Sequence, residues 1–190
     1  IAPYTKKLAG LKYLLLRREF RKANMKLKAT PKQGSFRILV SLGGGSEISD
    51  LLNLKIVQAL SVLKNWNGSA TATVIVGKMG QQSQQLIELA KQATWPIHIT
   101  GNVENMASEM FKSDIAIVSG GSTMWELLHM KVPFLALSLN EVQRNYLEFL
   151  EKEDICTNLG WYEQLTNERI GSSLINLSQN ETHRCQILEQ

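Results

Sequence analysis

The residues best suited to chemistry lie in the string IAIVSGGSTMWE, which spans Ile115–Glu126. Its apolar residues stop at a glycine turn, and a helical pattern with Glu126 in its first turn follows. This order is typical of a buried parallel strand that runs into a helix. Glycine lets the backbone approach a ligand, and a helix start presents unpaired N–H groups with partial positive charge. The string therefore predicts a phosphate site, with Glu126 one turn further on to accept hydrogen bonds from ribose hydroxyls.

A structural explanation competes for the same residues. The string Thr123-Met124-Trp125-Glu126 fits a capping box, in which Thr123 caps the helix and Glu126 reaches back to the Thr123 amide. Both explanations stay open here, because one geometry can serve either role. The candidate contacts of the string are Ser119, Gly120, Gly121, Ser122, Thr123 and Glu126.

A second glycine loop, Gly43-Gly44-Gly45-Ser46, follows an apolar run. Its spacing does not match the G-x-G-x-x-G fingerprint of dinucleotide sites, and the chain contains no Gly-Lys-Ser/Thr string of a P-loop. Both observations argue against NAD-dependent and P-loop ATP-hydrolysing enzymes. The loop suits a phosphate or a sugar, and a plain tight turn explains it nearly as well.

Two further loops have the composition of binding loops. Thr100–Met106 offers exposed backbone that can pair with the edge of a base, and a turn with a helix cap is its alternative explanation. Asn140–Asn145 is dense in amide and charged groups where an apolar run ends. Loops held by a rigid sheet are where sugars and phosphates are usually bound, although surface solubility also explains this composition.

No acid–base pair or metal site stands out in the chain. The three histidines are isolated, with His98 inside a strand pattern that predicts core packing and His129 at a helix end. Cys156 and Cys185 are too far apart for a CxxC motif, so we expect two reduced, partly buried thiols. The sequence therefore predicts binding loops with no catalytic residue, no metal and no cofactor in this chain.

Short apolar runs rich in β-branched residues alternate with helical patterns along most of the chain. The predicted strands, the last from a weaker pattern, are Arg37–Leu42, Thr71–Val76, Pro96–Ile99, Asp114–Val118, Pro133–Leu139 and Ile155–Asn158. The predicted helices are Leu51–Asn65, Gln82–Gln92, Asn105–Lys112, Thr123–Met130, Val142–Lys152, Asn167–Leu177 and one from Glu181 onward. This alternation predicts an α/β fold, a Rossmann-like doubly wound parallel sheet of about six strands, in which ligands bind at the carboxyl ends of the strands.

The first 34 residues differ from the rest in charge. The chain of 190 residues has a formal net charge of +4, and its Lys and Arg residues are concentrated in Lys6–Lys28. We divide it into a basic segment with a linker, 1–34, and a nucleotide-sugar-binding domain, 35–190. The basic segment lacks the interleaved aromatic residues of a nucleic-acid stacking surface, while contact with an anionic membrane surface stays open. No apolar run is long enough to span a membrane, and the sequence begins with Ile1 rather than Met, so we expect an upstream segment and a cytoplasmic protein.

Three stretches resemble a known family. They are GLKYLLLRREF at Gly10–Phe20, RILVSLGG at Arg37–Gly44, and Asn102–Gly160 with its SGGSTMWE string. Together they resemble the C-terminal half of the UDP-sugar hydrolase of bacterial pseudaminic acid biosynthesis and the spore-coat polysaccharide proteins. These proteins share the GT-B glycosyltransferase fold with the N-acetylglucosaminyltransferase of peptidoglycan synthesis.

The resemblance implies how each loop would be used. Gly120 to Thr123 would contact the diphosphate of UDP, and Glu126 would contact the ribose. The backbone of Asn102 and Val103 would contact the uracil, and Glu141 and Gln143 would lie near the sugar and β-phosphate. The turn at Gly43 and Gly44 would complete the UDP site.

The resemblance also implies where catalysis takes place. The family's histidine-bearing loop belongs to an N-terminal domain, and no such string occurs in this sequence. We therefore expect a UDP-binding domain of a UDP-sugar hydrolase, with the catalytic base on a missing N-terminal domain and little activity of this chain alone. The alternatives are the donor domain of a GT-B glycosyltransferase and a non-catalytic module that binds nucleotide sugars or a partner.

Overall fold

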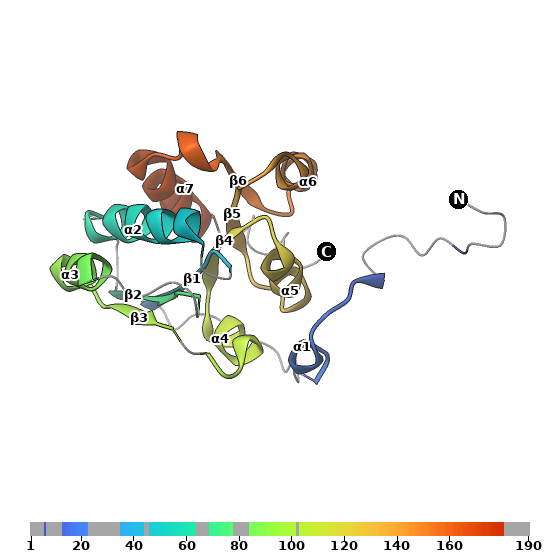
Figure 1. Ribbon diagram of the computed structural model, residues 1–190, viewed down its shortest axis with the longest axis horizontal. Helices are drawn as coiled ribbons and strands as arrows, with labels where there is room; N and C mark the ends of the chain where they lie inside the picture. The colour runs from blue at the N-terminus through green and yellow to red at the C-terminus, as the bar shows by residue number, and fades with distance from the viewer. Residues whose placement is uncertain are drawn as a thin grey trace.

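The computed structural model describes residues 6, 13–22, 35–43, 46–63, 69–77, 84–101 and 103–180. Its centre is a parallel sheet of six strands in the order β3-β2-β1-β4-β5-β6. The strands are β1 (Ser35–Ser41), β2 (Ser69–Ile75), β3 (Ile97–Thr100), β4 (Ile115–Ser119), β5 (Phe134–Ser138) and β6 (Thr157–Trp161). The predicted α/β, Rossmann-like parallel sheet is confirmed (Figure 1).

Helices cover both faces of the sheet, as Figure 1 shows. The α-helices are α1 (Arg18–Lys22), α2 (Glu47–Ser61), α3 (Gln84–Gln92), α4 (Met106–Lys112), α5 (Ser122–His129), α6 (Glu141–Lys152) and α7 (Asn167–Gln179), and a 3₁₀ turn, η2, spans Tyr162–Gln164. Alternating strand residues divide the core in two. Ile38 and Val40 of β1 pack with α2, α3 and α7, while Leu39 between them packs with α1, α4, α5 and α6. The central strands β4 and β5 are buried along their whole length, which is why their sequences are almost continuously apolar.

Two helices begin earlier than predicted. We expected helices from Leu51 and from Val142, but α2 begins at Glu47 and α6 begins at Glu141. Ser46 Oγ accepts a hydrogen bond from the Ser49 amide, and Asn140 Oδ1 accepts one from the Gln143 amide. These side chains satisfy amides that a helix start leaves unpaired, so each helix begins earlier than its apolar pattern indicates.

The order of the strands creates a switch point between β1 and β4. The chain proceeds from β1 outward to β2 and β3, then returns to place β4 on the other side of β1 and continues outward to β5 and β6. The loops after β1 and β4 therefore lead in opposite directions, and ligands of such sheets bind in the crevice between them. Ser119 Oγ donates to the Leu42 carbonyl at 3.3 Å, which joins the ends of these two strands.

An ion pair holds the other end of β1 and β4, where both strands begin. Arg37 donates to Asp114 from its backbone N at 2.9 Å, from Nε at 3.1 Å and from Nη2 at 3.0 Å. The Asp114 side chain is only 2% exposed, whereas that of Arg37 is 45% exposed. The hydrogen bond to Asp114 also raises the pKa of Arg37 above its ordinary value. The pair therefore fixes β1 beside the start of β4.

Cys156 is buried and makes no disulfide. Burial raises the pKa of its thiol to about 12, so the thiol is protonated and unreactive at neutral pH. The prediction of a reduced thiol in the core is confirmed for this residue. Cys185 lies outside the described residues.

The Arg37–Asp114 pair gives a test of how the switch point is supported. Arg37→Ala leaves a buried carboxylate without its cation, so we expect a loss of about 1–3 kcal/mol in the free energy of unfolding. Urea denaturation monitored by circular dichroism measures this loss. The control is Arg144→Ala, because Arg144 pairs with Glu141 and Glu148 on the exposed surface of α6. That change should cost less than about 0.5 kcal/mol, and equal losses in the two variants would contradict the assignment.

Candidate functional site

The turn after β4 contains two glycines with different surroundings. The Gly120 amide donates to the Leu137 carbonyl at 2.9 Å, and the Gly121 amide donates to the Ser119 carbonyl at 2.7 Å. A Cβ added at Gly120 would lie 3.0 Å from Gln143 Cβ, whereas one at Gly121 would meet only Ser119 Oγ, at 3.7 Å. Gly120 is therefore required for packing against α6. The space beside Gly121 is open, as close approach by a ligand requires.

The start of α5 is not closed by a capping box. The helix begins at Ser122, its N-cap is Gly121, and no side chain caps it. Thr123 is the second residue of the helix rather than its cap, and Glu126 lies beyond the first turn. The capping-box explanation is therefore wrong, because the N-cap lies at Gly121, two residues before Thr123. The first-turn amides keep their partial positive charge and face the edge of the sheet that holds the switch point.

Glu126 instead forms an ion pair with Arg17. Arg17 Nε lies 2.7 Å from Oε1 of Glu126, and Arg17 Nη2 lies 2.9 Å from Oε2. The Glu126 side chain is 5% exposed and the Arg17 side chain 54% exposed. The hydrogen bond to Glu126 is the main cause that raises the pKa of Arg17, so the guanidinium remains charged. Glu126 is thus a buried carboxylate with a bidentate cationic partner at the border of the solvent.

Sequence patterns did not single out Arg17. It was one of many cations in a basic segment, and 109 residues separate it from Glu126. Its neighbour Phe20 is completely buried and packs in the core beneath α4, α5 and α6. The only sequence signal was that Arg17 and Phe20 both lie in the stretch Gly10–Phe20, which carries part of the family resemblance.

Gln143 lies beside the glycine turn. Its Oε1 accepts a hydrogen bond from the Leu139 amide at 2.9 Å. Its Cβ is the atom nearest to a Cβ added at Gly120. Glu141 occupies the first position of α6, where its side chain is 70% exposed and lies 3.7 Å from Arg144 Nη1. The structure thus brings Gln143 to the turn after β4. Glu141 points into solvent at the same end of the sheet.

The remaining predicted residues lie on neighbouring loops. Gly43 lies two residues after the end of β1 and has a φ of 98°, a left-handed conformation that favours glycine. Val103 is partly buried against the core, in the loop between β3 and α4. Gly44 and Asn102 lie outside the described residues. The loop of Val103 borders an open hollow lined by Thr100, Val103, Glu104, Asn105, Ser108 and Glu109.

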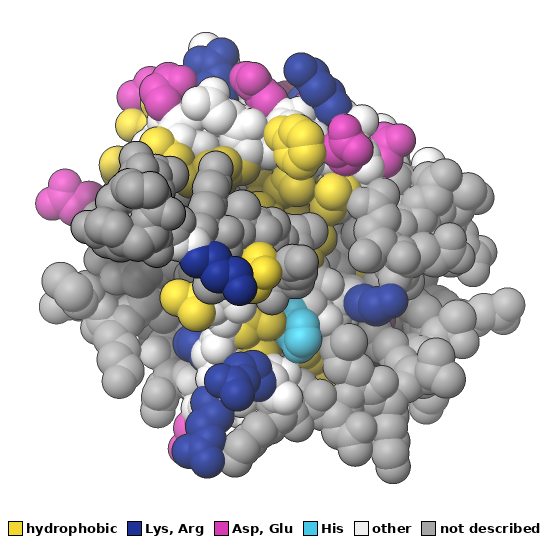
Figure 2. All heavy atoms as spheres, turned by 90° about the vertical axis from the view of Figure 1, so that its right-hand side faces the viewer, with side chains coloured by type: hydrophobic (Ala, Val, Ile, Leu, Met, Phe, Trp, Pro, Cys, Tyr) yellow, Lys and Arg dark blue, Asp and Glu magenta, His cyan; other side chains and the backbone are white. Residues whose placement is uncertain are grey.

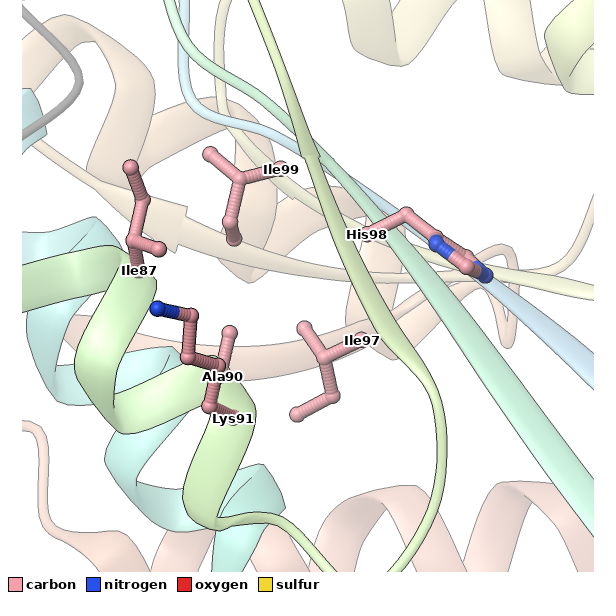
Figure 3. Close-up of a pocket in the computed structure, with 6 residues that line it drawn as sticks. All are labelled: Ile87, Ala90, Lys91, Ile97, His98 and Ile99. Atoms are coloured by element: carbon pink, nitrogen blue, oxygen red, sulfur yellow. The ribbon is translucent and has the colours of Figure 1, made fainter.

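A second hollow lies between α3 and the edge strand β3 (Figure 3). Ile97 and Ile99 face α3, and His98 lies on the opposite side of the strand. Because β2 and β1 separate β3 from β4, this hollow is not part of the switch point. His98 is exposed, so its predicted core packing is wrong: β3 is an edge strand and that face of it is open.

The described part of the basic segment packs beside α5. Leu16 contacts the core, whereas Leu15 is 98% exposed. Figure 2, which faces the side of the molecule where α1, α5 and α6 lie in Figure 1, shows apolar, basic and acidic side chains among the described residues. Within the described ranges, no helix is long and apolar enough to cross a membrane, and no group of His, Cys, Asp and Glu is arranged to hold a metal ion. The membrane-surface contact stays a prediction.

Comparison with protein families identifies the domain. Residues 39–186 match the glycosyltransferase family 28 C-terminal domain. The chain belongs to this family. The matched region contains all six described strands except the first four residues of β1, together with the switch point and α5.

Known proteins are similar to this chain in sequence or in fold. The chain is 33% identical over 146 residues to the uncharacterised protein MJ1062 of Methanocaldococcus jannaschii, a match that covers 75% of this chain and 29% of that protein. Acinetobacter baumannii MurG has a similar structure, with a TM-score of 0.70 and 19% identity over 85% of this chain and 46% of MurG. Spinosyn rhamnosyltransferase SpnG, solved with thymidine diphosphate, gives a TM-score of 0.57 and 16% identity over 83% of this chain and 41% of SpnG. The family 28 domain thus spans less than half the length of each of these proteins.

Replacement by alanine should have different effects at the two glycines of the turn after β4. Gly120→Ala should lower the free energy of unfolding by about 1–3 kcal/mol, because its methyl group would press on Gln143 and Leu147 of α6. Gly121→Ala should change it by less than about 1 kcal/mol, because a weaker helix cap is offset by the lower entropy of the unfolded chain. Thermal denaturation of the two variants measures the difference. Equal destabilisation would contradict the distinction between a packing glycine and an open one.

Proposed function

We propose that this family 28 domain binds the nucleoside diphosphate of a nucleotide-sugar donor, UDP above all, as the donor domain of a glycosyltransferase. One observation carries the proposal: the uncapped start of α5 lies at the β1–β4 switch point, and the buried carboxylate of Glu126 lies on the same helix. A helix start favours phosphate, and a carboxylate accepts hydrogen bonds from a ribose diol.

Each part of the site has a proposed contact. The open backbone at Gly121 and the amides of Ser122 and Thr123 would hold the diphosphate, and Glu126 would hold the ribose. The loop of Asn102 and Val103 would bind the uracil. The loop at Gly43 and Gly44 would border the phosphates, and Gln143 would border the β-phosphate and sugar, with Glu141 at their outer edge.

A transferase is favoured over a hydrolase by the family to which the domain belongs. The donor site would serve either reaction, because both break the bond between the sugar and the diphosphate. The helix start would stabilise the negative charge that develops on the leaving diphosphate. We assign the group that activates the nucleophile to a part of the protein outside this domain. In the hydrolase of pseudaminic acid or spore-coat biosynthesis that the sequence resembles, the nucleophile would be water.

Binding of UDP is the first test. With UDP at one hundred times its dissociation constant, stabilisation of about 2.7 kcal/mol is expected, which raises the melting temperature of a domain of this size by roughly 5–10 °C. Thermal shift and isothermal titration calorimetry measure both effects. The absence of stabilisation at millimolar UDP would refute the site.

Gly121→Ala tests the position of the diphosphate. The added methyl group would occupy the approach to the first-turn amides, so we expect UDP to bind at least about tenfold more weakly with a nearly unchanged melting temperature. Ser172→Ala is the control, because the Ser172 hydroxyl bonds only to carbonyls of its own helix. Unchanged UDP affinity in Gly121→Ala would place the diphosphate elsewhere.

The reaction class requires the full-length protein. Incubated with a UDP-sugar and no acceptor, a transferase should release little free sugar, whereas a hydrolase should release sugar and UDP in equal amounts. Chromatography of the products distinguishes the two. Sustained release of free sugar at the rate of UDP formation would replace the transferase proposal with the hydrolase.

A further inference from the structure

The Glu126 carboxylate has acceptor capacity beyond its ion pair. Arg17 forms a two-pronged contact, with Nε on one oxygen and Nη2 on the other. An ionised carboxylate offers about four lone-pair positions, so one hydrogen bond to each oxygen leaves further positions for other donors. A ribose diol has two hydroxyl donors, which matches the unused lone-pair positions on the two carboxylate oxygens. The ion pair and a bound ribose are therefore chemically compatible.

Arg17 is itself held in place by several contacts. Its Nη1 lies 3.0 Å from Oε1 of Glu19, and its guanidinium carbon lies 5.0 Å from the centre of the Phe20 ring. The Phe20 carbonyl lies 3.3 Å from Nε2 of His129, at the end of α5. The segment that carries Arg17 thus contacts α5 at two points, through Glu126 and through His129.

A buried carboxylate needs such a partner. Removing a carboxylate from water is costly unless a cation or hydrogen-bond donors compensate, and an uncompensated group takes up a proton or changes its rotamer. A bidentate guanidinium fixes the plane of the carboxylate as well as its charge. Lysine supplies the charge but not the planar fork.

We propose that Arg17 is a positioning residue of the nucleotide site, which holds the Glu126 carboxylate in the orientation that accepts the ribose hydroxyls. The inference rests on the proposed function, since it names how the ribose part of that site is assembled. It makes recognition of the sugar hydroxyls depend on a segment that precedes the sheet. Arg17 acts through Glu126 and needs no contact with the nucleotide.

The test compares UDP with 2′-deoxy-UDP by calorimetry, because the deoxy ligand lacks one of the two hydroxyls. The variants are Arg17→Ala, Arg17→Lys and the control Arg18→Ala, which changes an exposed neighbouring cation. We expect the unaltered chain to bind UDP about tenfold or more tightly than 2′-deoxy-UDP. Arg17→Ala should weaken UDP about tenfold and leave 2′-deoxy-UDP nearly unchanged, so that the preference largely disappears. Arg17→Lys should restore part of the preference, and Arg18→Ala all of it.

The outcomes separate this inference from the proposed function. If the unaltered chain fails to bind UDP, the proposed function and this inference both fail. If Arg17→Ala binds UDP and keeps the full preference over 2′-deoxy-UDP, only the role of Arg17 is overturned. Tighter binding of UDP by Arg17→Ala would also overturn it, because Arg17 would then block the ribose. Loss of affinity for both ligands in equal measure would indicate a purely structural role. If Arg17→Ala does not fold, the preference for UDP over 2′-deoxy-UDP is compared between Arg17→Lys and Arg18→Ala instead.

Discussion

The parallel pairing of β1 with β4 is the constraint on which the rest of the structure depends. It places strands from the two halves of the domain side by side at the middle of the sheet. The loops that follow them must then diverge, because one chain direction leads toward β2 and the other toward β5. The Arg37–Asp114 ion pair fixes one end of this strand pair, and the Ser119–Leu42 hydrogen bond fixes the other. The divergence of the loops at the candidate site is a consequence of that pairing.

The glycine turn shows how packing and binding share one short segment. Gly120 has no room for a side chain because α6 lies against it, so its smallness lets the helix approach the sheet. Gly121 has that room, yet it stands where the chain enters α5 and where no side chain caps the helix. A capped helix start would satisfy its own amides and would have less to offer an anion. The missing cap is therefore a small local cost in stability that leaves the helix start free for a ligand.

Local sequence patterns predicted the sheet well. Strands such as β4 and β5 are short, β-branched or apolar, and buried on both faces, so their residue types alone identify them. The helix starts at Ser46 and Asn140 were placed too late, because capping depends on one polar side chain outside the apolar pattern. His98 was misplaced because a strand pattern does not reveal that β3 is at the edge of the sheet. Arg17 was not predicted as the partner of Glu126, because the tertiary fold decides which of the many cations in the basic segment reaches that carboxylate.

The Arg17–Glu126 pair connects the stability of the domain with its chemistry. An ion pair with one buried member seldom adds much stability, since desolvation offsets the attraction. An aliphatic side chain would fill the position of Glu126 at lower cost, so the retention of a carboxylate there calls for a reason other than packing. Acceptance of ribose hydroxyls provides one, and the cation from outside the sheet provides the compensation that a buried carboxylate needs. On the proposed function, donor recognition would be a property of this domain, while the nucleophile would be supplied from outside it. Affinity for the nucleotide and class of reaction would then be separable, and proteins that share this donor site could differ in the reaction they catalyse.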